Sequence, residues 1–249
     1  MVQLKSHSEI EQMRKAGAIV GQILHELQDL VKPGVTTFDL DLYAMTRTKE
    51  MGAKPAFKGY QGFPSTLCVS VNEEVVHGIP NKKRILKDGD IVGVDFGVIL
   101  DGWYGDSAKT YPVGKVSAEA TQLLEVTEKS LFLGIAEALP GKNLFDIGAS
   151  IQKYVESFGY SVVREFVGHG IGRSLHEDPQ VPNFGVRGKG MILKPGMVIA
   201  IEPMINAGKP EVKILSDGWT AITADKKLSA HFEHTIAITE NGNEILTKV

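Results

Sequence analysis

The sequence carries an internal repeat: its second half matches its first half when the chain is shifted by 107 positions. The Pro-Gly pair at residues 33–34 falls on the Pro-Gly pair at residues 140–141, and Asp95 falls on Glu202. Further matches at this offset are Phe38/Phe145, Asp39/Asp146, Gly52/Gly159, Ile85/Ile192, Leu86/Leu193, Lys87/Lys194 and Gly89/Gly196. The repeat predicts two similar halves related by a pseudo-two-fold axis.

Each half is expected to run helix, Pro-Gly turn, helix, glycine and then strands. Ser8 and Glu11 form a capping-box pattern ahead of a first helix that stops near Pro33, and its counterpart begins near Ser117 and breaks at Pro140. Second helices are expected over residues 37–52 and 143–159. Val- and Ile-rich runs predict strands over residues 67–71, 91–98, 104–113, 161–167, 197–202 and 232–239. Together they predict an α+β fold, with residues 1–249 forming one domain whose repeat divides into residues 1–115 and 116–249.

Composition excludes several classes of protein. The 249 residues include 27 Lys and Arg against 30 Asp and Glu, so the chain offers no basic field for sequence-specific nucleic-acid binding. No run approaches the ~18 apolar residues of a membrane span, and the first residues lack the apolar stretch of a signal peptide. The single cysteine, Cys68, has no partner for an internal disulfide. We therefore expect a cytoplasmic protein that does not enter membranes.

Two carboxylates are expected on one face of a hairpin. Asp101 and Gly102 form a strong turn signal between the strand runs, which would pair Gly97 with Asp106. Asp95 lies two residues from Gly97 and therefore on the same face, diagonal to Asp106 and within ~7–8 Å of it. Two ionised carboxylates this close repel each other, so a proton or a cation is expected between them.

Three further residues extend this acidic set. Glu202, the repeat partner of Asp95, ends an apolar strand, and Glu233 alternates away from apolar neighbours in another. His169 sits in a glycine-rich loop, and neutral imidazole is the commonest nitrogen ligand of metals. Each acid alone is more typical of a surface position or an ion pair. A single histidine in a glycine-rich loop is more typical of a structural role. Four carboxylates with one histidine favour Mn, Fe(II), Co or Zn, and two such ions would suit hydrolysis.

Several segments, in this order, resemble the methionine aminopeptidases, specifically the short bacterial type I enzymes of the pita-bread metallopeptidase family. The matching segments are residues 71–80, 89–95, 104–106, 168–172, 175–177, 201–204 and 232–235. The resemblance covers nearly the whole chain. It implies a pita-bread fold, in which two pseudo-symmetric halves with antiparallel sheet covered by helices hold a dinuclear metal site, and it agrees with the repeat.

The resemblance also implies residue roles. Asp106 and Glu233 would bridge two divalent ions, with Asp95 on one ion and His169 and Glu202 on the other. A metal-bridging hydroxide would attack the carbonyl carbon of the first peptide bond and release an N-terminal methionine that precedes a small residue. Glu202 would also shuttle the proton. His77 and His176 would contact the substrate without binding metal: His176 beside the carbonyl, His77 near the scissile nitrogen or the adjoining backbone.

Substrate and partner expectations follow from the same resemblance. The methionine side chain would enter a pocket with Tyr60, Phe63, Cys68 and Trp219, although Cys68 also fits a buried apolar position. Phe57 and Leu175 stand where some members have a cysteine and an aromatic residue, and Phe57 alone fits core packing equally well. Asn72 and Ser229 match positions that help to hold a monovalent cation. The implied partners are N-terminal methionyl peptides, nascent chains and the ribosome near its exit tunnel.

Two competing interpretations remain open at this stage. Creatinase, prolidase and aminopeptidase P share the fold, and the latter two share the five metal ligands, but they usually carry an additional N-terminal domain for which the present chain leaves no room before its first helix. A non-enzymatic peptide- or ribosome-binding protein of the same fold would typically lose metal ligands, whereas all five are present here. Metal content, together with a comparison of Met-Ala-Ser and Xaa-Pro substrates, separates these possibilities.

Overall fold

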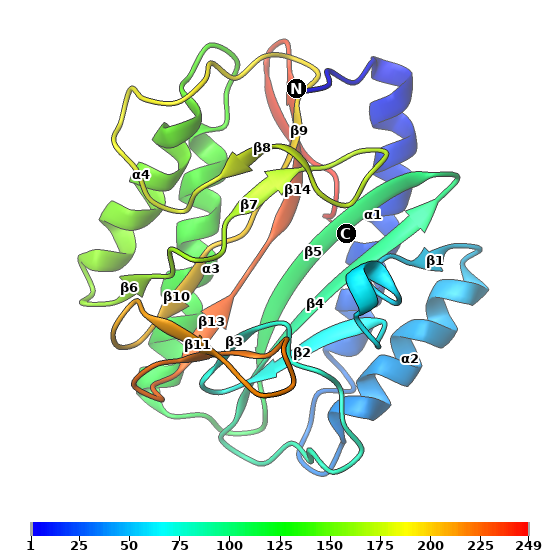
Figure 1. The fold of residues 1–249 in the computed structure, drawn as a ribbon, viewed down its shortest axis with the longest axis vertical. Coiled ribbons are helices and arrows are strands. Elements are labelled where there is room, and N and C mark those ends of the chain that lie inside the picture. The colour runs from blue at the N-terminus through cyan, green and yellow to red at the C-terminus, as the bar shows by residue number, and fades with distance from the viewer. Residues whose placement is uncertain (1, 249) are drawn as a thin grey trace.

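The structure is a computed structural model that describes residues 2–248. Two pairs of helices flank a central layer of strands, with the N-terminal pair on one side and the second pair on the other (Figure 1). The helices are α1 (His7–Leu27), α2 (Thr37–Glu50), α3 (Ala118–Glu137) and α4 (Leu144–Glu156), and a short 3₁₀ turn covers Tyr60–Gly62. No helix in the described part of the chain is long and apolar enough to cross a membrane.

The helix caps follow the expected chemistry with one correction. Helix α1 begins at His7, and its capping box is formed by Ser6 and Glu9, two residues before the expected Ser8 and Glu11. Both serines satisfy the sequence pattern, but Ser6 has the extended backbone of an N-cap, and its hydroxyl accepts a hydrogen bond from the Glu9 N–H. Helix α3 is capped by Ser117, as expected.

The structure repeats main-chain contacts at the offset found in the sequence. Thr36 forms a β-bridge with Ile85, and Asn143, its counterpart, forms one with Ile192. The N–H of Gly34 donates to the carbonyl of Leu86 at 2.9 Å, and the equivalent contact joins Gly141 to Leu193 at 2.9 Å. Both glycines have a positive φ, which a glycine adopts without steric cost. The structure thus repeats these main-chain contacts at the offset of the sequence repeat.

The strands form four antiparallel sheets. One sheet has the order β1-β4-β2 with β5 paired to β4, and its strands are β1 (Lys54–Pro55), β2 (Leu67–Val71), β4 (Ile91–Leu100) and β5 (Trp103–Pro112). The five-stranded sheet has the order β15-β14-β9-β7-β8: β15 (Gly242–Ile245), β14 (His234–Thr239), β9 (Val198–Ile201), β7 (Gly168–Gly170) and β8 (Glu177–Val181). Strands β4 and β9 begin at equivalent positions of the repeat.

Two smaller sheets complete the layer. The first has the order β13-β10-β6, with β13 (Ser229–His231), β10 (Met204–Asn206) and β6 (Ser161–Val162). The second has the order β11-β12-β3, with β11 (Val212–Ile214), β12 (Ala221–Thr223) and β3 (Glu74–Val76). The strand expected over residues 161–167 is wrong in length. It ends at Val162 because the chain leaves this sheet before β7 begins in another.

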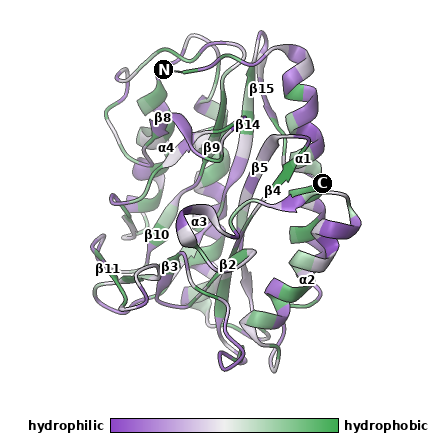
Figure 2. Ribbon diagram, turned by 45° about the vertical axis from the view of Figure 1, so that its right-hand side comes forward, coloured by the Kyte–Doolittle hydropathy of each residue, from purple (hydrophilic) through white to green (hydrophobic). Residues whose placement is uncertain are grey.

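Most buried apolar residues pack into two large cores, and a third apolar cluster, which includes Met13, Trp103, Ile171 and Val198, joins the two halves. One core gathers α1, α2 and the first sheet, with Phe96 and Leu40 fully buried, and the other gathers α3, α4 and the five-stranded sheet around Ile147 and Ile151. Figure 2 shows the hydrophobic colour concentrated on the central strands, and the hydrophilic colour on outer helix surfaces and loops. Contacts between β5 and β14 place the two larger sheets side by side.

Candidate metal centre and substrate pocket

The β4–β5 hairpin has the predicted register. Leu100 pairs with Trp103 and Gly97 with Asp106, while the turn residues Asp101 and Gly102 both have positive φ values, 50° and 79°. Such a turn matches the right-handed twist of the two strands and fixes which side chains share a face. The hairpin therefore carries two aspartates on one face: Asp106 and the Asp95 side chain diagonal to it.

The second half supplies the remaining candidate ligands. His169 lies in β7, Glu202 directly follows β9, and Glu233 lies between β13 and β14. The Glu233 N–H donates to the carbonyl of Ala108 at 2.9 Å, and Ala108 is the residue paired with Asp95. The main-chain bond fastens Glu233 to the hairpin of the first half, so the seam between the halves runs through this cluster.

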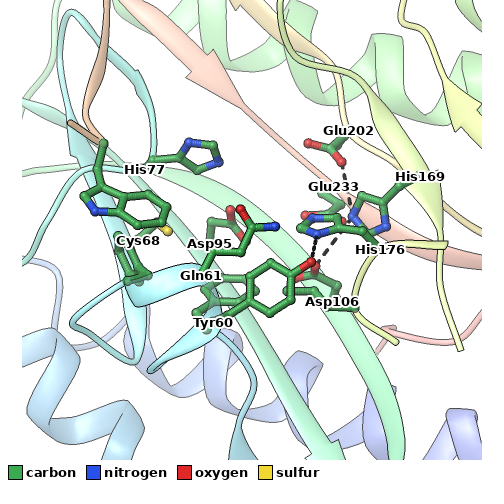
Figure 3. A pocket seen from close by; sticks show the side chains of 14 residues that line it. Tyr60, Gln61, Cys68, His77, Asp95, Asp106, His169, His176, Glu202 and Glu233 are labelled. Carbon is green, nitrogen blue, oxygen red and sulfur yellow. Dashed lines mark hydrogen bonds and ion pairs between the residues drawn. The ribbon is translucent and has the colours of Figure 1, made fainter. Parts of the chain in front are cut away.

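All five predicted ligands line one cavity of about 150 Å³ (Figure 3). Nε2 of His169 lies 3.5 Å from Oε1 of Glu202 and 3.8 Å from Oδ2 of Asp106. One ligand atom from each of Asp106, His169 and Glu233 falls within 4.8 Å of the others. These separations suit groups that converge on a common ion.

The carboxylates are buried without enough partners. Oδ1 of Asp95, Oδ1 of Asp106 and Oε1 of Glu233 have no hydrogen-bond partner among the described residues. Burial raises the pKa of Asp95 to about 7 and that of Glu202 to about 8. The pKa values of Asp106 and Glu233 rise well above their ordinary values, first through burial and then through the neighbouring carboxylates. Without bound cations this cluster holds protons, and divalent ions would replace them.

The His169 ring is in the neutral protonation state that a metal ligand requires. Its Nδ1 lies 2.9 Å from the carbonyl oxygen of Gly170, which can only accept, so Nδ1 carries the ring proton. Burial, followed by the nearby His176, lowers the pKa of His169 to about 3, so the ring is neutral and Nε2 presents a bare lone pair. That lone pair faces two carboxylates. The donor set fits a borderline divalent cation between these groups.

A further buried histidine was missed by the sequence analysis. Nε2 of His231 lies 3.7 Å from Oε2 of Glu202 and has no hydrogen bond. Burial lowers the pKa of His231, while Asp95 acts in the opposite direction. His231 lies two residues before Glu233, and this strand spacing is the signal that could have found it.

The predicted pocket residues line the same cavity as the carboxylates. Tyr60, Phe63, Cys68 and Trp219 all contribute, and the ring of Trp219 packs edge-on against Phe63 with centroids 5.2 Å apart. Burial and then Asp95 raise the pKa of the Cys68 thiol well above its ordinary value, so the thiol is neutral and lines the pocket as a small apolar group. The cavity is also lined by Phe57, Leu175 and Gln61, of which Gln61 was not foreseen.

The two histidines expected to contact substrate also border the cavity. Nδ1 of His176 lies 2.7 Å from the Tyr60 hydroxyl, and the His176 ring stands edge-on to His169 with centroids 4.4 Å apart. His77 has a positive φ of 61° and packs edge-on against Phe166. Burial lowers the pKa of His176 and lowers that of His77 to about 4. Both rings are therefore neutral hydrogen-bonding groups near pH 7.

The pair Asn72 and Ser229 lies together at a different place. The Ser229 N–H donates to the carbonyl of Asn72 at 2.9 Å, and the Asn72 backbone has a positive φ of 59°. The Ser229 hydroxyl donates to Oδ1 of Asn206 at 2.9 Å. Neither Asn72 nor Ser229 lines the cavity that holds the carboxylates.

A buried cluster of carboxylates around a neutral imidazole, opening beside an apolar pocket, defines a metal-dependent hydrolase. Comparisons with known proteins show which family of such hydrolases the chain belongs to. The model of metallopeptidase family M24 matches residues 11–240. A methionine aminopeptidase of Bacillus subtilis is 56% identical over 249 residues, covering 100% of both chains. The chain therefore belongs to metallopeptidase family M24, among its methionine aminopeptidases.

Solved structures agree with this assignment. A methionine aminopeptidase from Thermotoga maritima has a TM-score of 0.99 and 50% identity, covering 100% of both chains. A prolidase from Pyrococcus furiosus, 24% identical, shares the fold with a TM-score of 0.79; the match covers 99% of this chain but 65% of that one. The predicted α+β pita-bread fold is confirmed.

Proposed function

We propose that this chain removes the N-terminal methionine from peptides and nascent proteins whose second residue is small. The observation that carries the proposal is the continuity of one cavity: the buried carboxylates and His169 form part of its wall, and Phe63, Cys68 and Trp219 form an apolar part beside them. A thioether side chain in the apolar part would bring its own carbonyl to the carboxylates. The methionine sulfur would also be attracted to the aromatic rings of Phe63 and Trp219.

The ligand assignment follows the chemistry of the side chains. Asp106 and Glu233 would be shared by two divalent ions, with Asp95 completing one site and His169 and Glu202 the other; Mn, Co, Fe(II) or Zn suit these donors. Two such ions would activate a water and polarise the substrate carbonyl. Because ligands from both halves are needed, we also propose that residues 1–249 act as one catalytic domain.

The protein's own residues then handle protons and orientation. Burial alone raises the pKa of Glu202 to about 8, but bound cations would hold it ionised, so that it could accept a proton from the attacking water and pass it to the leaving amine. The Tyr60 hydroxyl lies 2.7 Å from Nδ1 of His176; in this role it would donate to Nδ1, which would leave the ring proton on Nε2, free to donate to the substrate carbonyl. His77, neutral near pH 7, can accept the scissile N–H on its bare ring nitrogen or donate its own N–H to an adjoining backbone carbonyl.

Metal content and substrate choice test the proposal together. Protein stripped by a chelator should lose hydrolysis of Met-Ala-Ser, and Mn, Co or Fe(II) should restore it with two ions bound per chain. The reloaded protein should cleave Leu-Ala-Ser and an Xaa-Pro dipeptide far more slowly, because a branched leucine lacks the flexible thioether and its contact with the aromatic rings, and a peptide without a large apolar first side chain loses ~1.5–3 kcal/mol of burial. Full activity without metal, or equal turnover of Leu-Ala-Ser, would exclude the proposed reaction.

Three finer expectations belong to the same proposal. The carbonyl of Asn72, beside Ser229, would help to hold a monovalent cation. If so, replacing K⁺ by choline should lower the melting temperature, and an unchanged Tm would remove this site. The cytoplasm and the ribosome near its exit tunnel are the expected location and partner for an enzyme acting on nascent chains, and cosedimentation with translating ribosomes measures the latter.

A further inference from the structure

The short turn before β2 has a strained backbone at a residue that faces the candidate site. Gly59 and Gly62 adopt φ values of 88° and 92°, which glycine tolerates, but Gln61 between them has φ 48° and ψ 22°. A side chain with a Cβ is disfavoured in this left-handed region, and Gln lacks the short polar group that helps Asn and Asp to occupy it. A glycine would fit this backbone better.

Local hydrogen bonding gives no reason for a glutamine here. The turn is closed by bonds from Tyr60 N–H to the Phe57 carbonyl at 2.9 Å and from Phe63 N–H to the Tyr60 carbonyl at 2.9 Å. Gln61 itself makes no hydrogen bond with any residue in the part of the chain that the structure describes, through either its main chain or its carboxamide. Its side chain is exposed, so it does not serve the core either. Strain that local contacts do not explain is typical of functional positions.

The position of the side chain indicates its role. Gln61 lines the cavity that holds the carboxylates, and Figure 3 shows its carboxamide turned toward the middle of that cavity. The preceding residue, Tyr60, is held by its bond to His176. Because Gln61 is exposed while Phe63 and Cys68 are buried, Gln61 lies toward the mouth of the cavity. A peptide whose first side chain fills the buried part would extend past Gln61 with its following residues.

We propose that the Gln61 carboxamide binds the main chain of the substrate on the far side of the scissile bond. A carboxamide has the same donor and acceptor as a peptide group, so its Nε2 can donate to a substrate carbonyl while its Oε1 accepts a substrate N–H. Binding through the main chain serves peptides of any sequence after the second residue. This inference rests on the proposed function, because it assigns a subsite for the same peptide substrate.

The test separates substrate binding from backbone strain. Gln61→Gly removes the carboxamide and relieves the strain, so its Tm should be equal to or above that of the parent protein. Lys226→Gly is the matched control, because Lys226 is exposed, has a positive φ of 61° and does not line the cavity. Gln61→Asn keeps an amide, one methylene shorter, on a residue that tolerates this backbone.

Two substrates locate the contact along the peptide. Met-Ala-Ser offers a main chain beyond the scissile bond, whereas methionine p-nitroanilide offers only the leaving group. In Gln61→Gly, kcat/KM for Met-Ala-Ser should fall about tenfold more than kcat/KM for the anilide, as expected for two lost hydrogen bonds. The Asn variant should fall between Gly and the parent, and Lys226→Gly should keep the parental ratio.

The possible outcomes are distinct. A parental ratio of the two kcat/KM values in Gln61→Gly would overturn the inference while leaving the proposed function intact. A drop in Tm for Gln61→Gly, with equal losses on both substrates, would show that Gln61 has a structural role only and would also overturn it. Failure of the parent protein to cleave Met-Ala-Ser would instead refute the proposed function itself.

Discussion

The candidate site depends on the proton position of single imidazoles. His169 uses its Nδ1 proton on the Gly170 carbonyl and turns a bare Nε2 toward the carboxylates. The neighbouring His176 has its Nδ1 2.7 Å from the Tyr60 hydroxyl, and with that hydroxyl as the donor, as we propose above, the ring proton lies on Nε2. One neutral ring thus offers a lone pair suited to a cation, and the neighbouring ring offers an N–H suited to a developing negative charge. The Nδ1 partners differ in kind: the Gly170 carbonyl can only accept a hydrogen bond, whereas the Tyr60 hydroxyl can also donate one.

This contrast predicts different results for three alanine variants. His176→Ala should lower kcat by ~10²–10³, the usual effect of losing one donor to a developing oxyanion. His77→Ala should lower kcat at least about tenfold. Both should keep two metal ions per chain, whereas His169→Ala should lose metal affinity because a ligand is gone. Metal analysis with single-turnover kinetics on all three variants measures this. Parental rates, or metal loss in the His77 or His176 variant, would contradict the assigned roles.

Among the elements, the loop between β7 and β8 stands out because the N-terminal segment holds it. Nζ of Lys5 lies 2.5 Å from Oε2 of Glu177, and both side chains are largely buried. The other carboxylate oxygen of Glu177 accepts the N–H groups of Arg173 at 2.8 Å and Ser174 at 3.2 Å. The ion pair therefore shapes the loop that presents His176 to the cavity, although Lys5 lies far from it in sequence.

Breaking this pair should loosen the loop. Lys5→Met leaves Glu177 buried without its counter-charge and should cost about 3 kcal/mol, lowering Tm by roughly 6–12 °C. Because His176 moves with the loop, KM for Met-Ala-Ser should rise while both metals stay bound. Adding Glu177→Gln, which keeps an acceptor for the two N–H groups but removes the charge, should recover part of the Tm.

An exposed ion pair provides the control for the Lys5 and Glu177 variants. Lys142 pairs with Glu137 at 3.8 Å, and its side chain is 47% exposed. Lys142→Met should therefore lose less than about 1 kcal/mol and leave KM unchanged. If the double variant of Lys5 and Glu177 is no more stable than Lys5→Met alone, the buried charge is not the cause of the loss.

Individual helices, strands and turns also show which features local sequence patterns can predict and which they cannot. The Asp101-Gly102 turn predicted the hairpin register, because strand periodicity is a local rule. The convergence of Glu202 and Glu233 on that hairpin came from the repeat and the family resemblance. The Ser6 cap was missed because Ser8 offers the same pattern two residues later. Gln61 and the Lys5–Glu177 pair were missed for a different reason. Their importance comes from backbone strain and from contacts between distant segments, neither of which leaves a periodic signal.

At the scale of the whole molecule, the repeat explains why so many acids can be buried together. Each half contributes a strand that starts at an equivalent position, β4 with Asp95 and β9 followed by Glu202, and each half has its own apolar core. These cores, together with the apolar cluster that joins the halves, supply stability that offsets the cost of burying the acids at the seam. A pair of divalent ions at the seam would offset that cost and tie the halves together.

The stability of the metal-free protein should therefore fall as pH rises. Burial raises the pKa of Asp95 to about 7 and that of Glu202 to about 8, whereas the unfolded chain releases these protons near pH 4. Between pH 7 and 9 the native state thus binds more protons than the unfolded state, and the free energy of unfolding decreases by up to about 1.4 kcal/mol per pH unit for each such proton. The buried histidines, with lowered pKa values, are neutral in both states by then and add nothing.

Bound metal should cancel this dependence, because the ions require the carboxylates in the charged form that high pH favours. Thermal melts from pH 7 to 9 should show Tm falling for chelator-treated protein and level or rising for Mn-loaded protein, so that the two curves diverge. Metal-free Asp95→Asn removes one of the titrating groups and should fall less steeply than the metal-free parent. Parallel curves with and without Mn would mean that these carboxylates are not the groups to which the ions bind.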